Sequence, residues 1–299
     1  MKKSRKLIFL LLATFILQCA KKEEKKKSEF LPTVEVTSVK KTKVIRTLKL
    51  FGSITGEEQV MVFSKITGRV TEITKPEGSV VQEGEAIVYV LNDIPGMDYK
   101  PGPVPSPISG IVGKIYVEVG QMVSPQTPIA NVANYARRVK VKAPISDQDL
   151  RWVKKNTRAE ISLTAYPDQT FTGKVTNVSP ILDPISRTAT VEVTIPNQEK
   201  KLLPGMACDI KLVLEEKEDV PALPISAVFT EGKPRVFVVE NETAYLREVE
   251  IGLIGEELME IVSGLKIGDQ VITIGKERVK DGGRIRVVSR TSPQGEEER

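Results

Sequence analysis

The chain has 299 residues with 44 basic and 39 acidic side chains, no histidine, and an aromatic content of only 5%. Four of the basic residues stand among the first six, so the rest of the chain is close to neutral. A nucleic-acid-binding protein of this size generally has a clear basic excess and aromatic stacking platforms, and we therefore expect no nucleic acid as a partner. The missing histidine removes the commonest general base and metal ligand, so we expect no enzyme, no metal site and no cofactor.

A secretory signal is predicted for residues 1–18, because a basic head precedes an apolar run over residues 7–17. The run is shorter than the about 20 apolar residues of a membrane-spanning helix. Cys19 stands where a lipoprotein signal places its acylated cysteine, although Gln18 replaces the small residue that is usual before it. Two interpretations follow: acylation of Cys19, with residues 19–32 as a charged tether, or ordinary cleavage beside an unmodified cysteine. We expect lipid attachment at Cys19.

Beyond Pro32 the sequence is typical of β structure. Short β-branched runs, many of them alternating, are separated by Gly, Pro, Asn and Asp; they include Val34–Val36, Val60–Val62, Val139–Val141, Val191–Val193 and Val236–Val239. The one helix that we predict runs from Ser146 to Lys155, since Ser146 can cap it. Cys208 lies in an alternating apolar stretch and is expected to be a buried free thiol.

An internal repeat is the most informative feature of the chain. Eight residues recur at a constant offset of 42 positions: Ile66, Gly68, Val70, Ile73, Gly78, Val81, Ile87 and Val90 return as Ile108, Gly110, Val112, Ile115, Gly120, Val123, Ile129 and Val132. Neither copy can bury its apolar face alone. The repeat therefore predicts two similar halves that pack on each other as a small quasi-symmetric β-sandwich.

The segment between the two copies is rich in proline. Residues 91–106 contain four prolines and two glycines, and proline inside a helix costs about 3 kcal/mol or more. A long helical hairpin is excluded here. We predict instead a proline-stiffened loop over residues 92–105.

Several segments together resemble the periplasmic adaptors, also called membrane fusion proteins. Those of the lipoyl-like domain are Gly68–Gly84 and Pro107–Val123; those of the β-barrel are Ser186–Val191, Asn197 and Leu203–Met206; those of the membrane-proximal domain are Pro224–Val228, Ser263–Asp269 and Val279–Gly283. The resemblance runs in order from about residue 34 to 288. It is greatest to adaptors of resistance–nodulation–division efflux pumps, in a variant without the α-helical hairpin.

The resemblance implies a mainly β, elongated, multi-domain chain that runs out through its domains and returns through them. The expected parts are a signal peptide (1–18), an anchor and tether (19–32), a membrane-proximal β domain (33–44 plus 217–290), a small β-barrel (45–58 plus 137–216), a lipoyl-like barrel-sandwich hybrid domain (59–136, with halves 59–91 and 106–136) and a disordered tail (291–299).

The implied function is coupling without catalysis. The resemblance implies a periplasmic adaptor that is held to the inner membrane by its lipid, binds an inner-membrane efflux transporter, and forms a homo-oligomeric ring of six. An outer-membrane channel or a bridging component would complete the path. Alternatives are an adaptor of an ABC-type exporter or secretion system, a free-standing structural lipoprotein, and a lipoyl or biotinyl carrier. The neighbours of Lys100 do not resemble the pattern of a carrier's acceptor lysine.

A candidate partner contact lies at Asp183, Arg187 and Thr188, beside the barrel signature. Two interpretations stand side by side. The residues contact the transporter or a neighbouring subunit, or Arg187 forms a salt bridge with Asp183 where the chain leaves a turn.

Overall fold

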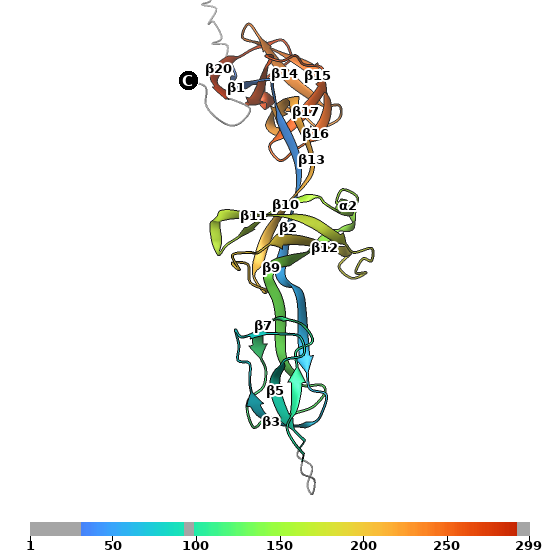
Figure 1. Ribbon diagram of the computed structural model, residues 1–299. Coiled ribbons are helices and arrows are strands. Elements are labelled where there is room, and N and C mark those ends of the chain that lie inside the picture. The colour runs from blue at the N-terminus through green and yellow to red at the C-terminus, as the bar shows by residue number, and fades with distance from the viewer. Residues whose placement is uncertain (1–30, 93–98, 292–299) are drawn as a thin grey trace, which may run out of the picture. The chain divides into compact units, whose positions relative to one another are not determined.

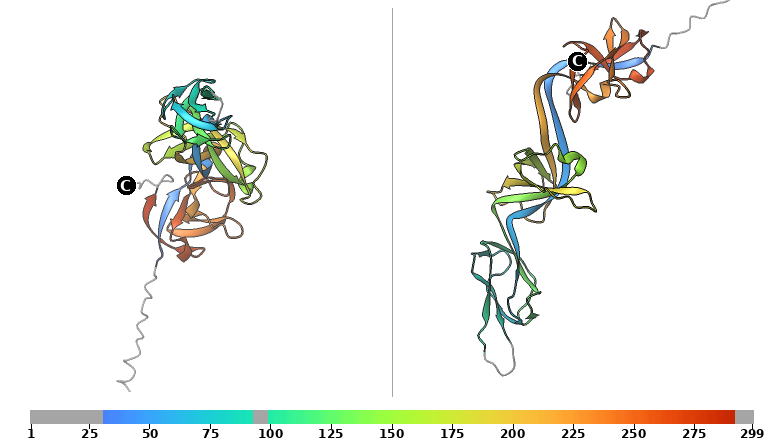
Figure 2. Two further views of the ribbon diagram at one scale, coloured as in Figure 1. Left: turned by 90° about the horizontal axis from the view of Figure 1, so that it is seen from below. Right: turned by 90° about the vertical axis from the view of Figure 1, so that its right-hand side faces the viewer.

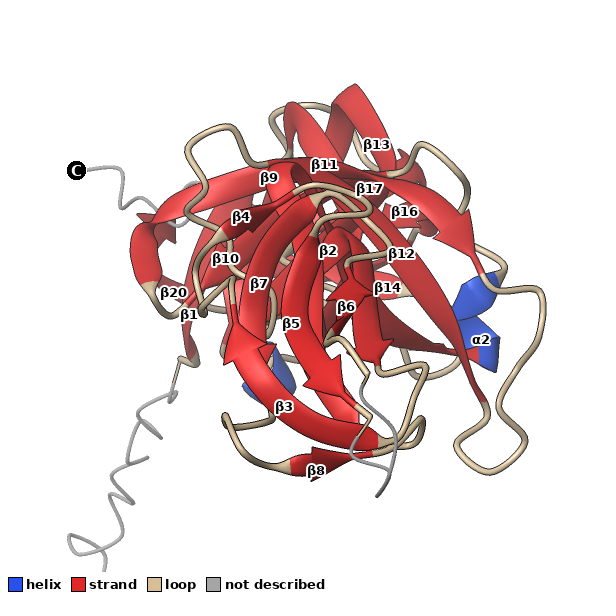
Figure 3. Ribbon diagram, turned by 60° about the horizontal axis from the view of Figure 1, so that its bottom comes forward, coloured by secondary structure: helices blue, strands red, loops and turns tan. Residues whose placement is uncertain are grey.

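The computed structural model describes residues 31–92 and 99–291, and strands dominate it (Figures 1 and 3). The mainly β fold class is confirmed, and within the described ranges the longest helix has four residues. No helix in those ranges is long and apolar enough to cross a membrane. The predicted signal, Cys19, most of the tether, part of the proline-rich loop and residues 292–299 lie outside the described residues.

The chain divides into two compact units. The first contains the described residues of Met1–Val39, Ser226–Val249 and Gly264–Arg299, and the second contains Lys40–Ile225 and Glu250–Ser263. Each unit is assembled from segments that are distant in the sequence. Non-local strand pairing therefore determines both units.

The first unit is built on a six-stranded sheet in the order β19-β15-β14-β18-β1-β20. Its strands are β1 (Thr33–Ser38), β14 (Arg235–Glu240), β15 (Thr243–Glu248), β18 (Gln270–Ile274), β19 (Gly283–Arg284) and β20 (Arg286–Thr291). Short 3₁₀ turns occupy η1 (Ile225–Ala227) and η2 (Lys276–Arg278). Strand β1 pairs antiparallel with β18 and parallel with β20, so the first and last strands join one sheet. Val34, Val36, Phe237 and Ile272 form its buried core.

The second unit contains a closed six-stranded β-barrel. Its strands are β2 (Lys40–Phe63), β9 (Pro128–Ser146), β10 (Arg158–Leu163), β11 (Tyr166–Val178), β12 (Thr188–Pro196) and β13 (Ala207–Pro224). The pairings β2–β13, β13–β10, β10–β11, β11–β12, β12–β9 and β9–β2 complete a circuit. Alternate residues point inward, as the two-residue period of a strand requires; on β9, Val139, Val141, Ala143 and Ile145 are at most 1% exposed.

The same unit contains a β-sandwich made by the far ends of β2 and β9 and six short strands. These are β3 (Gly68–Ile73), β4 (Val80–Val81), β5 (Ala86–Leu91), β6 (Gly102–Pro105), β7 (Gly110–Ile115) and β8 (Met122–Val123). One sheet has the order β6-β5-β3-β8, and the pairings β2–β9, β9–β7 and β7–β4 make the other. Adding or subtracting 42 from the residue numbers of each strand in one sheet gives the corresponding strand of the other sheet. Each sheet takes strands from both copies of the repeat.

Hydrogen bonds repeat with the same offset. Gly78 donates its N–H to the carbonyl of Val112 at 2.8 Å, and Gly120 donates to the carbonyl of Val70 at 2.7 Å. The hydroxyl of the buried Ser64 donates to its own loop, to Ile66 O at 2.7 Å, and the hydroxyl of Ser106 does the same to Ile108 O at 2.7 Å. The predicted quasi-symmetric sandwich is confirmed, and its two halves exchange strands.

The structure corrects two expectations of local structure. Gly102–Pro105 belongs to strand β6 rather than to a loop, because β6 is the edge of its sheet and an edge strand tolerates proline. The predicted helix begins as expected, with the Ser146 hydroxyl accepting from Asp149 N, but α2 spans only Asp147–Leu150. Tighter turns follow, in which Trp152 and Val153 donate to carbonyls three residues back, and Val153 enters the barrel core.

The second unit also contains a hairpin of β16 (Glu250–Ile254) and β17 (Leu258–Ser263). Strand β17 pairs with the end of β13, and β13 in turn lies beside β2 over most of its length (Figure 2). In the sequence the hairpin stands between β15 and β18, which belong to the first unit. It is an insertion of the second unit into the sequence of the first.

Candidate functional site

The β11–β12 loop, residues 179–187, carries the two most exposed large apolar side chains of the barrel. Ile185 is 94% exposed and Ile181 is 77% exposed, just above Phe51 of β2 at 76%; Leu182 in the same loop is 37% exposed. Full burial of one such aliphatic side chain stabilises an assembly by about 1.5–3 kcal/mol. Apolar side chains that gather on an exposed loop are typical of a protein-contact surface.

Hydrogen bonds inside the β11–β12 loop hold it in one conformation. Asp183 Oδ1 accepts from Ile185 N at 2.9 Å, from Ser186 N at 2.8 Å and from Ser186 Oγ at 3.1 Å. The Ser179 hydroxyl donates to Ile181 O at 2.9 Å. The backbone N–H bonds from Ser186 and Ile185 favour the charged carboxylate and so lower the pKa of Asp183 below its ordinary value. The loop is ordered without help from a partner.

The three predicted contact residues meet at the closure of this loop. Asp183 N donates to Thr188 O at 2.9 Å, and Arg187 N donates to Asp183 O at 2.8 Å. Arg187 has a φ of 54°, the left-handed backbone that such a tight closure needs. Within the described ranges Arg187 and Asp183 form no ion pair, and Asp183 Oδ1 accepts from backbone donors instead. Asp183 and Thr188 shape the loop, and the partner contact stays a prediction.

The sequence pattern points to the polar residues Asp183, Arg187 and Thr188 and does not by itself identify Ile181, Leu182 and Ile185. A signal for them exists. The segment Ser179-Pro180-Ile181-Leu182-Asp183-Pro184-Ile185-Ser186 places three large aliphatic residues among turn-forming ones. Residues of that kind in a turn have no core to enter. Their exposure could have been suspected from this composition.

Other residues of the barrel signature are structural. Asn197 is 4% exposed; its amide donates to Tyr135 O and Leu202 O, each at 2.8 Å, and its oxygen accepts from Leu202 N at 3.0 Å. Gly205, with a φ of 96°, is the third residue of the Leu203–Met206 turn that leads into β13. These residues hold the barrel together.

Cys208 is a buried free thiol, as predicted. Burial raises its pKa to about 11, so the reactive thiolate is scarce at neutral pH. Within the described residues, no group of three or more Cys, Asp or Glu side chains could hold a metal ion. Lys100 is exposed and precedes β6.

Comparisons with known proteins agree with this fold. Residues 138–216 match the family profile described as a CusB-like β-barrel domain, and residues 220–287 match the YknX C-terminal permuted SH3-like domain. SilB of Salmonella typhimurium, whose name contains the term membrane fusion protein, is 28% identical over 174 residues, 58% of this chain and 40% of SilB. The multidrug resistance protein MdtE of Escherichia coli K12 is 26% identical over 206 residues, 62% of this chain and 52% of MdtE.

Among solved structures, MacA from Actinobacillus actinomycetemcomitans has the same fold, with a TM-score of 0.67 and 18% identity over 79% of this chain and 98% of MacA. The matched domains and the similar proteins support the class of periplasmic adaptors. The chain is similar to membrane fusion proteins of the resistance–nodulation–division type. It spans about half, or less, of the length of the curated relatives named here.

Proposed function

We propose that the protein is the periplasmic adaptor of an efflux pump and couples an inner-membrane transporter to the export path without catalysis. Its relative MdtE is named a multidrug resistance protein, and the two matched domains cover the barrel and much of the first unit. In this proposal an outer-membrane channel or a bridging component completes the path, and six copies form a ring. Acylated Cys19 holds each copy at the inner membrane.

Domain assignments follow from the same proposal. The sandwich is the lipoyl-like domain (59–136), the barrel domain takes residues 45–58 and 137–216, and the membrane-proximal domain takes residues 33–44 and 217–290. The strand circuit of β2, β9, β10, β11, β12 and β13 supports the second assignment. The exchanged strands of the sandwich support the first.

The β11–β12 loop carries the proposal. Its apolar side chains are Ile181, Leu182 and Ile185, and its conformation is already held by Asp183 and Ser179. A preformed loop loses little conformational entropy when it binds, so most of the gain from burial appears as affinity. We propose that these side chains enter an apolar depression on the periplasmic surface of the transporter, and that Arg187 lies at the rim of the contact.

The test is co-purification with the transporter encoded by the neighbouring gene, from membranes of cells that express the full chain. Ile181→Asp and Ile185→Asp together should weaken capture at least tenfold, since each substitution removes burial worth about 1.5–3 kcal/mol. Ile254→Asp, at a 46% exposed isoleucine of β16, is the matched control and should leave capture unchanged. Unaltered capture by the double variant contradicts the proposed contact. Capture of a transporter with a nucleotide-binding subunit assigns the alternative partner class.

Intact mass of the mature protein tests the anchor. Acylation predicts a chain that begins at Cys19 and carries a lipid mass, and Cys19→Ser should release the protein from the membrane fraction. A mature chain without added lipid contradicts the anchor but leaves the transporter contact standing. A lipoyl or biotinyl mass on Lys100 would favour the carrier alternative.

A further inference from the structure

Part of β2 and β13 forms a ribbon whose two strands have few other partners. Strand β10 pairs with β13 only over Asp209–Val213 of β13, and β9 pairs with β2 only from Ser53 onward. Between these stretches and the strand ends, Lys40–Thr47 of β2 faces Val213–Ala222 of β13, with two register shifts. A two-stranded ribbon alone is marginally stable in water. This ribbon needs another element to be stiff.

The β16–β17 hairpin supplies that element. Strand β17 pairs with Ala222–Pro224 of β13, and Ile225 N donates to Glu257 O at 3.0 Å. A small apolar cluster of Val44, Ala222 and Leu253, each at most 3% exposed, joins the hairpin to both strands of the ribbon. The hairpin therefore extends the ribbon to four strands at one end.

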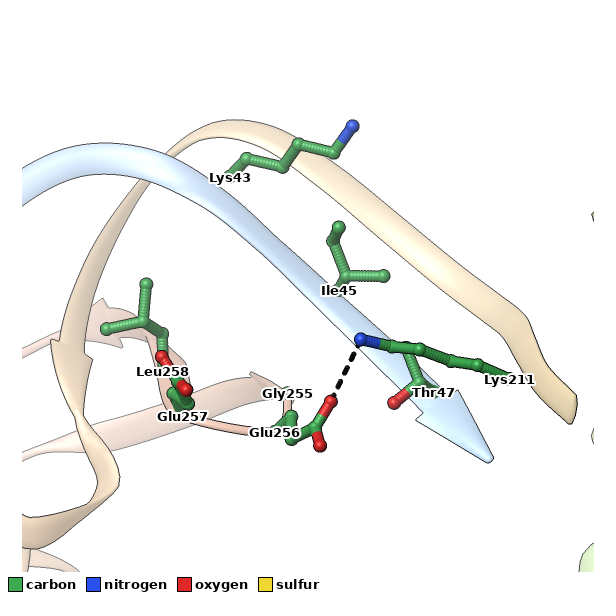
Figure 4. A pocket seen from close by; sticks show the side chains of 8 residues that line it. All are labelled: Lys43, Ile45, Thr47, Lys211, Gly255, Glu256, Glu257 and Leu258. Carbon is green, nitrogen blue, oxygen red and sulfur yellow. Dashed lines mark ion pairs between the residues drawn. The ribbon is translucent and has the colours of Figure 1, made fainter. Parts of the chain in front are cut away.

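Ion pairs fasten the tip of the hairpin. The Glu256 carboxylate accepts from Lys211 of β13 at 3.1 Å (Figure 4). It also pairs with Lys49 of β2, so one side chain bridges both strands. These lysines lower the pKa of Glu256 below its ordinary value. A hollow of about 280 Å³ lies beside the tip, and Lys43, Lys211, Ile45 and Thr47 are among the residues that line it (Figure 4). These ion pairs add to the backbone hydrogen bond from Ile225 N to Glu257 O in holding the tip.

A second ion pair fastens β17 more firmly, one residue beyond the Ile254–Met259 pair. Glu260 is 8% exposed, and its Oε2 accepts from Lys217 Nζ at 2.7 Å and from Leu253 N at 2.6 Å. At the tip, a Cβ on Gly255 would stand 2.7 Å from Ile45 O, so the hairpin backbone touches β2 directly. Glu260 is buried and Glu256 is exposed, so the two ion pairs differ in how easily they open.

We propose that the β16–β17 hairpin is an ionic clasp that sets the stiffness of the β2–β13 ribbon. With Glu256 bound to Lys49 and Lys211 the clasp is closed and the ribbon is stiff. Loss of these pairs loosens the tip while Glu260 keeps the hairpin attached, and the ribbon then flexes more freely. Because exposed ion pairs weaken as salt rises, ionic strength opens the clasp. This inference does not depend on which transporter the protein binds.

Hydrogen–deuterium exchange of the full chain, read by mass spectrometry, tests the clasp. In Glu256→Gln, peptides from residues 40–49, 215–224 and 250–263 should exchange about 3- to 10-fold faster than in the wild type, the size expected for a shared exposed pair. The matched control is Glu257→Gln, because Glu257 lines the same hollow and makes no ion pair within the described ranges. Sodium chloride at 1 M should speed exchange of the wild type and remove its difference from Glu256→Gln.

Three results would overturn the proposal. Equal exchange rates in Glu256→Gln and the wild type would show that the Glu256 ion pairs do not stabilise the ribbon. Exchange that is accelerated as much in Glu257→Gln as in Glu256→Gln would show a general effect of charge. Faster exchange throughout residues 158–196 would show loss of the barrel rather than opening of the clasp. The exchanged-charge variant Lys211→Glu with Glu256→Lys should return the three peptides toward the wild-type rate, which a mere loss of folding would not allow.

Discussion

Alanine at the two repeated glycines of the sandwich tests the physical basis of the assignment. A Cβ on Gly68 would stand 2.1 Å from Leu91 O, and a Cβ on Gly110 would stand 2.7 Å from Ala133 O. Residues 91 and 133 are themselves 42 positions apart, so the repeat predicts that both glycines permit the same close approach of paired strands. Both neighbours are backbone atoms and cannot turn away as a side chain can.

The magnitude follows from these distances. A carbon normally stays more than 3 Å from a carbonyl oxygen, so the strand beside Gly68 must move by about 1 Å and the strand beside Gly110 by about half as much. Overpacking of this kind costs about 1–3 kcal/mol, and a broken strand hydrogen bond adds about 1 kcal/mol. We expect Gly68→Ala to destabilise the sandwich by about 2–4 kcal/mol and Gly110→Ala by about 1–3 kcal/mol.

Local hydrogen exchange is the suitable assay, because a chain with several domains need not unfold in two states. Amides of residues 68–91 and 110–133 should exchange about 30- to 1,000-fold faster in Gly68→Ala, at tenfold for each 1.4 kcal/mol. Gly113→Ala is the control on the strand of Gly110, since the nearest atom to its Cβ, Asn131 O, is 3.5 Å away. If Gly110→Ala costs no more than Gly113→Ala, the close-approach reasoning fails.

Three further predictions concern the barrel and the hairpin. Asn197→Ala should destabilise the barrel by about 2–4 kcal/mol, because the buried Leu202 N loses its acceptor. The fluorescence of Trp152, the one tryptophan of the sequence, reports this loss of stability during urea unfolding. A loss of stability under about 1 kcal/mol would contradict the prediction. Asp183→Ala should make the β11–β12 loop severalfold more sensitive to trypsin at Arg187, whereas equal cleavage would show that the loop is held otherwise. Hydrogen bonds from Lys217 and Leu253 N lower the folded-state pKa of Glu260. The charged Glu260 therefore contributes its full share of folding stability above the unfolded pKa of about 4.3, and this stability is lost as pH falls through the lower folded pKa. The difference in unfolding temperature between the wild type and Glu260→Gln should therefore be present at pH 7 and vanish in strong acid; a difference that persists there would refute the charge-based account.

The internal repeat shows which parts of the sandwich a local sequence pattern can predict. Glycine and β-branched residues stand at fixed positions in both copies, and each has a local cause in a turn or a strand. The pattern could not show that β4 pairs with β7 and β3 with β8. That exchange depends on contacts between the copies, and identical local signals are compatible with strands that stay within their own half.

The proline-rich segment shows both what a local property can predict and what it cannot. Residues 91–106 were correctly excluded from a helix, because the missing amide is a local property. The same reasoning wrongly denied Gly102–Pro105 a place in a sheet, since only the position of β6 at an edge makes its prolines harmless. Likewise, Ser146 marked the start of α2, whereas its end depends on Val153 entering the barrel core.

By itself the sequence determined the β class, the two-copy sandwich, the starting point of α2 and the family signatures, because backbone conformation and strand periodicity are properties of neighbouring residues. Only the tertiary structure decided that six strands close into a barrel, that the Asp183 carboxylate accepts hydrogen bonds from backbone amides, and that Ile181 and Ile185 are exposed. It also decided that the β16–β17 hairpin fastens onto β2 and β13. Exposure and ion pairing join residues distant along the chain, and no local pattern records which distant strands will meet.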